Sequence, residues 1–428
     1  MRYLQILFLF IVLFSNCTSS SNESLKDFEK QLNTLLEQKN YFKLRDLLAS
    51  RQYQLTKEKE LYYKAHIAKA FGERARSMSL IKELMSNYAH QLPDSILVNI
   101  LDIQAENYLY NYEYGQAAQL YELILTKYPN QLDSNEKATV ANAKALFGSL
   151  SKVGPQIMHA HPTVTINSYR NKFNHLMTPV KSEGIEADFI FDTGANLSAI
   201  SEHMAKKLNL KMIDQEVELG SSTKIKVQTK LAVADSFYVG SILFEQVVFL
   251  VIPDEQLYFP QSKYQIEGII GFPLIHAMEE IKMHKDGQLS IPIIAKEKSL
   301  HNLMLVGLQP VVKLTSGKKT LYFTFDTGAK SSELSYKYFK ENKANVEKYA
   351  QFQQNLHSGV GGSEKSSEYM VSEFPVRLGS KSAVLAKIPV KLEEYEFYNE
   401  FDGNLGQDLF MKFNTLIINF KYMYVDFE

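Results

Sequence analysis

The chain has 428 residues and is nearly neutral, with 47 Lys and Arg against 48 Asp and Glu, and 45% of its residues are hydrophobic. This length is enough for about two to four domains that each bury a core. The balanced charge gives no electrostatic reason to expect nucleic acid as a ligand. The single Cys excludes an intrachain disulfide and every multi-cysteine metal site.

The first segment, residues 1–16, is predicted to be a signal peptide. One basic residue precedes an apolar run from Leu4 to Phe14, which is interrupted only by Gln5. The run is shorter than the roughly 20 apolar residues that a transmembrane helix needs, and it fits the apolar core of an export signal. We therefore expect the chain to be exported.

Cys17 follows this segment and precedes a small polar tract, Thr18 to Asn22, so the segment resembles the end of a bacterial lipoprotein signal. The resemblance implies that Cys17 is lipidated and that its acyl chains attach the protein to a membrane. Asn16 departs from the small residue usual before that Cys, and the alternative is a cleaved signal with an incidental Cys. The tract has no early acidic cluster, which favours the outer membrane, facing the periplasm.

Residues 24–153 are predicted to form a helical domain, because they contain few Gly and Pro and their apolar residues recur at helical spacing. Leu25, Phe28 and Leu32 are an example of this spacing of three and four residues. Nothing in this region marks a catalytic group. Its helical segment is expected either to separate the rest of the chain from the membrane or to bind a protein partner.

The stretch EYGQAAQLYELILTKYPN, residues 113–130, resembles the second helix of a tetratricopeptide repeat, with Ala117, Tyr121 and Pro129 at favoured positions. A weaker copy lies 40 residues earlier, around Leu80 to Tyr88, which is longer than the usual repeat period. The resemblance implies irregular tetratricopeptide-like repeats. The alternative is a bundle of about six or seven helices without a peptide-binding groove.

From Gly154 onward, short runs rich in Val, Ile, Tyr, Phe and Thr alternate with turn residues, which predicts strands. The pattern occurs twice. The segment EADFIFDTGANLSAIS at 186–201 is echoed by LYFTFDTGAKSSELS at 321–335. Gly271 follows Asp192 by 79 residues, and Gly406 follows Asp326 by 80. A terminal hairpin ends each half. We predict two homologous all-β lobes, residues 160–297 and 301–428.

The two DTGA copies contain the residues that are predicted to be catalytic. In each copy an Asp follows an apolar strand, Gly allows a tight turn, and Thr can hydrogen-bond the backbone or its counterpart. Two such loops related by an approximate twofold axis bring their carboxyls face to face, and like charges so close share one proton. The pair then supplies a base for water and an acid for a peptide carbonyl without a metal or a covalent intermediate.

On these residues the chain resembles the retropepsin-like aspartic peptidases, whose signature is a DTG(A/S) loop, a flap hairpin and a later apolar-apolar-Gly motif. The resemblance covers about residues 160–428 and implies a pseudo-twofold peptidase with a catalytic dyad of Asp192 and Asp326. It assigns the active-site loops to Thr193, Gly194, Ala195, Thr327, Gly328 and Ala329, the supporting motif to Ile270, Gly271, Leu405 and Gly406, and the flaps to Leu219, Gly220, Ser221, Gly359, Gly361 and Gly362.

Two features depart from the family pattern, and a third distinguishes the loops from those of pepsin. Asn404 stands where an apolar residue is usual, so the packing of the second loop is expected to differ. Lys330 follows the second DTGA, and it either lowers the apparent pKa values of the dyad, binds an acidic substrate side chain, or points to solvent. Ala195 and Ala329 lack the hydroxyl that Ser offers in pepsin-like loops, which predicts raised dyad pKa values and a pH optimum less acidic than that of pepsin.

Other chemistries find little support in the sequence. His159 and His161 form a lone HxH beside a Pro, and no metal site is predicted. Serine, cysteine and metallopeptidase motifs are missing. We expect a lipid-anchored aspartic endopeptidase of the bacterial cell envelope that cleaves an extended polypeptide and needs no cofactor. The alternative is a non-catalytic peptide-binding or scaffold lipoprotein that uses its helical repeats and a decayed peptidase pair.

Overall fold

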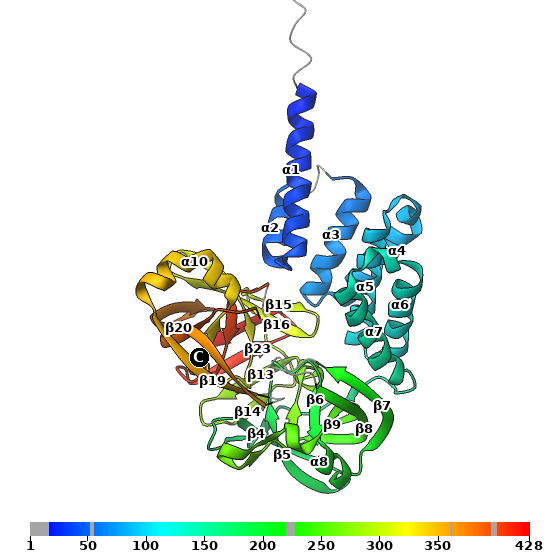
Figure 1. The fold of residues 1–428 in the computed structure, drawn as a ribbon. Coiled ribbons are helices and arrows are strands. Elements are labelled where there is room, and N and C mark those ends of the chain that lie inside the picture. The colour runs from blue at the N-terminus through cyan, green and yellow to red at the C-terminus, as the bar shows by residue number, and fades with distance from the viewer. Residues whose placement is uncertain (1–16, 52–54, 220–226, 360–361, 395–399) are drawn as a thin grey trace, which may run out of the picture.

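The computed structural model describes residues 17–51, 55–219, 227–359, 362–394 and 400–428. The predicted signal peptide, residues 1–16, lies outside these ranges. Helices come first along the chain and a β-rich region follows, which confirms the predicted order (Figure 1). Within the described ranges no helix is both long and apolar enough to cross a membrane.

The helical region contains seven described α-helices, and consecutive helices pack against each other. Contacts between α3 and α5, the first helices of two successive hairpins, give the region the form of stacked helical hairpins. The two segments that look alike at an offset of 40 residues lie on α4 and α6, each the second helix of its hairpin. The tetratricopeptide assignment itself stays a prediction. The helices are α1 (Cys17–Glu37), α2 (Tyr41–Arg51), α3 (Lys57–Ala70), α4 (Arg74–Tyr88), α5 (Asp94–Tyr110), α6 (Tyr114–Lys127) and α7 (Ser134–Ser149).

Local sequence explains where these helices begin and end. Asp133 caps α7, because its carboxylate accepts hydrogen bonds from the first turn while Glu136 bonds back to the Asp133 amide. Short 3-10 turns follow α4 and α6, at Ala89–Gln91 and Pro129–Gln131. Pro129 suits such a turn because its ring fixes the backbone and it has no amide to donate.

The first β-rich half is built on a nine-stranded sheet with the order β1-β9-β6-β12-β5-β4-β8-β7, and β3 is added beside β4. Helices α8 (Glu202–Lys207) and α9 (Phe272–Ala277) accompany it. The strands are β1 (Ile157–Met158), β3 (Tyr169–Arg170), β4 (Leu176–Ser182), β5 (Ile185–Phe191), β6 (Ser198–Ser201), β7 (Lys211–Leu219), β8 (Val227–Val239), β9 (Ile242–Ile252) and β12 (Gly268–Ile270), with a separate small pair β10 (Tyr258–Phe259) and β11 (Tyr264–Gln265).

The second half is built on an eight-stranded sheet with the order β15-β16-β17-β22-β18-β21-β20-β19. Helices α10 (Tyr336–Tyr349) and α11 (Gln407–Phe410) accompany it. The strands are β15 (Leu303–Val306), β16 (Gln309–Ser316), β17 (Lys319–Phe325), β18 (Glu333–Leu334), β19 (Gln351–Gly359), β20 (Gly362–Leu378), β21 (Lys381–Lys391) and β22 (Gly403–Leu405).

A five-stranded sheet joins the two halves, in the order β2-β14-β13-β23-β24. Its central pair is antiparallel and consists of β13 (Glu280–His284) from the first half and β23 (Thr415–Asn419) from the second. The strands β2 (Val164–Ile166) and β14 (Leu289–Ile291) continue it on one side and β24 (Tyr424–Phe427) on the other. The two terminal hairpins expected from the sequence, β13–β14 and β23–β24, are therefore present, and they meet each other.

One apolar core runs through both halves and includes the fully buried rings of Phe189, Phe191, Phe323 and Phe325. These rings alternate along β5 and β17, as expected for strands with one face on the core. Packing of these rings in the core thus fixes the two strands that end at the DTGA loops.

The helical region packs on both halves (Figure 1). Helices α1 to α5 contribute to an apolar cluster with Met304, Val311 and Tyr322 of the second half. The hydroxyl of Tyr110 donates to the Gly307 carbonyl, and that of Tyr112 donates to the Pro273 carbonyl at 3.0 Å. A region that only separated the β-rich halves from a membrane would not need these contacts, so the helices are part of the same packed body.

Candidate active site

Both DTGA loops begin where a central strand ends. β5 ends at Phe191 and β17 ends at Phe325, and each pairs in parallel with a short strand from the later motif, β12 or β22. The amide of Asp192 donates to the Ile270 carbonyl and that of Asp326 to the Leu405 carbonyl, both at 3.0 Å. The two loops are held in the same way by equivalent neighbours.

The threonines of the two loops hold each other's backbone. The Thr193 hydroxyl donates to the Phe325 carbonyl at 2.8 Å and accepts from the Thr327 amide at 3.1 Å. The Thr327 hydroxyl does the reverse, donating to Phe191 at 3.0 Å and accepting from the Thr193 amide at 3.0 Å. Both side chains are buried, so these four bonds fix the two loops relative to each other.

The two carboxyls lie against each other's loops. A Cβ added to Gly194 would come within 2.6 Å of Cγ of Asp326, and one added to Gly328 within 2.4 Å of Cγ of Asp192. Side chains never approach so closely, so only glycine fits at either position. The structure thus brings Asp192 and Asp326 together, at a distance that allows the carboxyls to share a hydrogen bond.

This pairing changes the acidity of Asp192. Burial and the negative charge of Asp326 raise the pKa of Asp192 well above its ordinary value, and the shared hydrogen bond acts in the same direction. The Gly194 amide, which donates to Oδ1 of Asp192 at 2.8 Å, acts against this shift. Two adjacent carboxyls that cannot both ionise tend to share one proton. The catalytic role of the pair stays a prediction.

The supporting motif lies directly beneath the loops. A Cβ on Gly271 would come within 2.5 Å of the Leu197 carbonyl carbon, and one on Gly406 within 2.6 Å of that of Ser331. Ile270 and Leu405 are fully buried. The next residues, Phe272 and Gln407, donate their amides to Ala195 and Ala329 at 2.8 and 3.0 Å. These contacts pack the motif against both DTGA loops, and its assignment as the family's supporting motif stays a prediction.

Sequence reasoning missed two serines that complete this arrangement. The Ser198 hydroxyl accepts from the Gly271 amide at 3.1 Å, and the Ser332 hydroxyl accepts from the Gly406 amide at 3.0 Å. Each serine follows its Asp by six residues, and both lie within the compared segments 186–201 and 321–335, so a position-by-position alignment of these segments contains the signal.

A polar bridge also links the second loop to the first half. The Gln407 side chain donates to the Thr327 carbonyl at 2.9 Å and accepts from Arg170 at 2.7 Å and Asn174 at 2.9 Å. Because Arg170 and Asn174 belong to the first half, this bridge braces the loop of Asp326 from the opposite side. No pattern in the sequence pointed to it.

The structure shows where the two departures from the family pattern, Asn404 and Lys330, lie. Asn404 is buried on β22 and donates from Nδ2 to Oδ2 of Asp326 at 3.4 Å, so the position that is usually apolar contacts a carboxyl of the pair. Lys330 is exposed. Burial, Asp326 and backbone amides set the pKa of Asp192.

The expected flaps fall on two hairpins. β7 and β8 form the first, which closes at the pair Leu219 and Val227. β19 and β20 form the second, which closes at the pair Gly359 and Gly362. The predicted flap residues Gly220, Ser221 and Gly361 lie outside the described residues. The role of both hairpins as flaps stays a prediction.

The remaining sites named from the sequence lie apart from the two carboxyls. Cys17 is the first residue of α1, and its lipidation stays a prediction. His159 pairs with Glu245 at 3.0 Å, and Nδ1 of His161 contacts the Pro162 carbonyl. Across the described residues, no group of three or more His, Cys, Asp or Glu is placed to hold a metal ion.

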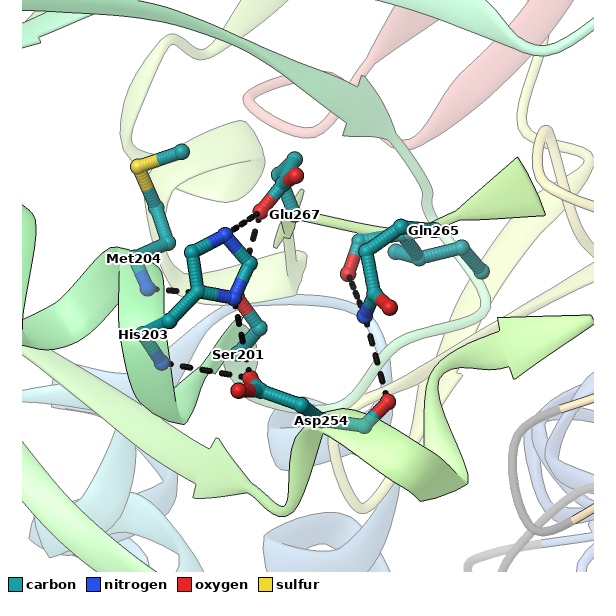
Figure 2. Close-up of polar contacts among 7 residues, drawn as sticks. Ser201, His203, Met204, Asp254, Gln265 and Glu267 are labelled. Atoms are coloured by element: carbon teal, nitrogen blue, oxygen red, sulfur yellow. Dashed lines mark hydrogen bonds and ion pairs between the residues drawn. The ribbon is translucent and has the colours of Figure 1, made fainter. Parts of the chain in front are cut away.

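A charged cluster stands beside the strand that supports the first loop. Figure 2 shows the His203 imidazole between Asp254, 3.0 Å from Nδ1, and Glu267, 2.7 Å from Nε2. Burial raises the pKa of Asp254, but hydrogen bonds from the His203 amide and imidazole outweigh it and hold the pKa below its ordinary value. Since Glu267 directly precedes β12, the cluster ties α8 to the segment that leads into the supporting motif.

Comparison with known families agrees with this geometry. Residues 178–274 match the family model described as an aspartyl protease. The matched segment contains Asp192 and Gly271, and the second half lies outside it. A search of curated proteins finds no match. A segment of the first β-rich half is therefore similar to an aspartyl protease family, and a helical region precedes it along the chain.

Proposed function

We propose that the protein is an aspartic endopeptidase that hydrolyses peptide bonds with water activated between Asp192 and Asp326. The observation that carries this proposal is the reciprocal placement of the two carboxyls, each against the glycine of the other loop. The match of the first half to an aspartyl protease family and the raised pKa of Asp192 support it. A decayed pair would not need to keep both carboxyls and both threonines in this arrangement.

The chemistry follows from a carboxyl pair that holds one proton. The ionised member takes a proton from water as the water oxygen forms a bond to the peptide carbonyl carbon, and the protonated member gives its proton to the carbonyl oxygen. In the second step the amide nitrogen receives a proton, the C–N bond breaks and the new carboxyl forms. The pair returns to its starting state, so no cofactor is consumed.

The substrate is proposed to be a polypeptide in an extended conformation. The hairpins β7–β8 and β19–β20 each follow the helix after a DTGA loop, α8 or α10, and long hairpins of this kind can pair with a strand-like peptide backbone. Alternating side chains of the peptide would then enter separate pockets, which sets the cleavage preference.

We further propose that the protein is exported and anchored through a lipid on Cys17, in the outer membrane and facing the periplasm. The short apolar run before Cys17 and the polar tract after it support this location. Labelling of cells with radioactive palmitate tests it. Label on the wild-type chain and none on Cys17→Ala is the expected result, whereas label on neither chain contradicts it.

The proposed activity is tested with a mixed peptide library from acid to neutral pH, read by mass spectrometry. Wild-type protein, Asp192→Asn and Asp326→Asn are compared, with a statine-type inhibitor as a further arm. Cleavage by the wild type that disappears in both variants and with the inhibitor supports the proposal. Peptide binding without cleavage at any pH contradicts it and favours a peptide-binding protein.

A further inference from the structure

The two halves differ at one pair of matched positions directly behind the carboxyls. In the first half, Ile190 on β5 lies beside Ile269 on β12. In the second half, the equivalent neighbours on β17 and β22 are Thr324 and Asn404. All four side chains are buried. A pair of apolar side chains has thus been replaced by a pair of polar ones on one side of the site only.

The polar pair is oriented toward Asp326. The Thr324 hydroxyl donates to Oδ1 of Asn404 at 2.7 Å, and Nδ2 of Asn404 donates to Oδ2 of Asp326 at 3.4 Å. A carboxamide oxygen can only accept, so the bond from Thr324 turns the amino group of Asn404 toward the carboxylate. In the first half, Ile190 and Ile269 belong to an apolar cluster and offer no donor to Asp192.

Backbone amides also contact both carboxyls. Oδ1 of Asp326 accepts from the amides of Gly328 and Ala329, both at 2.8 Å. Oδ1 of Asp192 accepts from the Gly194 amide at 2.8 Å, whereas the equivalent Ala195 amide points to the main-chain carbonyl of Asp192. Donors aimed at a carboxylate favour its ionised form, and the Gly328 amide acts on Asp192 as well. The donor that distinguishes Asp326 from Asp192 is therefore the side-chain amide of Asn404.

The other charged groups around Asp326 are engaged elsewhere. On the elements packed against its loop, Asp408 of α11 accepts from Ser332, and Asp402 before β22 pairs with Lys337. Arg170, which reaches over from the first half, bonds to Gln407, and Lys330 on the loop itself is exposed. The ionisable group that faces Asp326 directly is Asp192.

We propose that Asn404, oriented by Thr324, is a positioning residue that gives the two carboxyls fixed and different roles, with Asp326 as the ionised base and Asp192 as the protonated acid. This inference rests on the proposed peptidase function. A pair of identical carboxyls would otherwise exchange these roles freely, and the polar pair breaks that symmetry.

The roles give a balanced reaction. Asp326 takes a proton from water as the water oxygen bonds to the carbonyl carbon, and Asp192 gives its proton to the carbonyl oxygen, which forms a geminal diol. Asp326 then passes its proton to the amide nitrogen as the C–N bond breaks. Asp192 takes a proton back from a diol hydroxyl, which becomes the carbonyl of the new acid, and both carboxyls regain their first states.

The test compares the pH dependence of kcat/KM for the full-length protein and for Asn404→Leu. Asn404→Leu removes a donor that favours the ionised form of Asp326, so the acid limb of the profile should move up by about one pH unit, with a roughly tenfold loss of kcat/KM on that side. Asn404→Asp, which places a further negative charge beside Asp326, should move it further. Ile269→Leu is the matched control in the first half and should leave the acid limb in place.

A second variant and a second measurement allow the inference to be refuted even if Asn404→Leu does not fold or no cleavage is detected. Thr324→Val releases the Asn404 side chain without changing it, and it should shift the limb in the same direction if Asn404→Leu does not fold. A carbon-13 NMR titration of labelled aspartates, with Asp326→Asn for assignment, reports the site of the proton even without cleavage. The inference is overturned if wild type and Asn404→Leu show the same acid limb and the same titration. A wild-type protein that cleaves no peptide overturns only the proposed function.

Discussion

The reciprocal threonine bonds make the strongest prediction about how the two halves are held together. Thr193→Val keeps the shape of the side chain and removes its hydroxyl. The Phe325 carbonyl then loses a donor at 2.8 Å, and the Thr327 amide loses an acceptor at 3.1 Å. All of these groups are buried, and water cannot replace the lost hydroxyl without opening the contact between the loops.

The expected loss of stability follows from these two bonds. A buried hydrogen bond contributes about 1 kcal/mol, and a buried amide left without an acceptor costs about 1–3 kcal/mol more. Thr193→Val should therefore lower the free energy of unfolding by about 2–4 kcal/mol. Cleavage should fall by about 100-fold as well, because the neighbouring Asp192 loses its fixed position.

Urea unfolding followed by tyrosine fluorescence measures the stability, and hydrolysis of a library-derived peptide measures activity. The matched control is Thr178→Val, because Thr178 is equally buried but its hydroxyl accepts a single bond, at 3.0 Å from Ser168, within the first half. That control should lose about 1 kcal/mol and keep its activity. A loss in Thr193→Val no larger than in this control would refute the reasoning.

Three further predictions concern the site and its surroundings. Gly194→Ala places a methyl group 2.6 Å from Cγ of Asp326, so it should abolish cleavage while the circular dichroism spectrum stays native. The control Gly148→Ala meets Ala118 at an ordinary 3.9 Å and should change neither cleavage nor the spectrum. Cleavage by Gly194→Ala would contradict the close contact. Because the pKa of Asp192 is raised on folding, the native state loses stability as pH rises from the ordinary aspartate pKa toward that raised value. Asp192→Asn should therefore melt at a higher temperature than wild type at pH 7 and show little difference at about pH 3. Equal melting temperatures of the two proteins at both pH values would contradict the raised pKa. Removal of residues 24–153 uncovers Met304 and Val311, so the remaining chain should bind a hydrophobic dye and aggregate; a monomer that melts like the full chain would show that the helices are dispensable for stability.

The sequence was most informative where a pattern is local or repeated. Amphipathic spacing indicates the helices, and two DTGA copies with nearly equal distances to Gly271 and Gly406 indicate two similar β-rich halves. The turn at Asp286 and Gly287 predicted the hairpin β13–β14. Each of these features depends on residues within one segment, or on a comparison of two segments.

Contacts between distant segments could not be read in this way. The pairing of β13 with β23 and the packing of the helices on both halves depend on surfaces that meet only in three dimensions. Asn404 shows the difference most clearly. In the sequence it is a departure from an apolar motif, and only the orientation set by Thr324 connects it to Asp326.

The sheet shared by the two halves has a consequence for the order of folding. Lys282 of β13 pairs with Ile417 of β23, 135 residues further along the chain. Contacts between such distant residues form slowly, since a long loop must close before they are made. A chain in which only one half has folded holds one carboxyl of the pair, and the other carboxyl reaches its place when the two halves join. The proposed reaction needs both carboxyls, so a chain with one folded half would lack it.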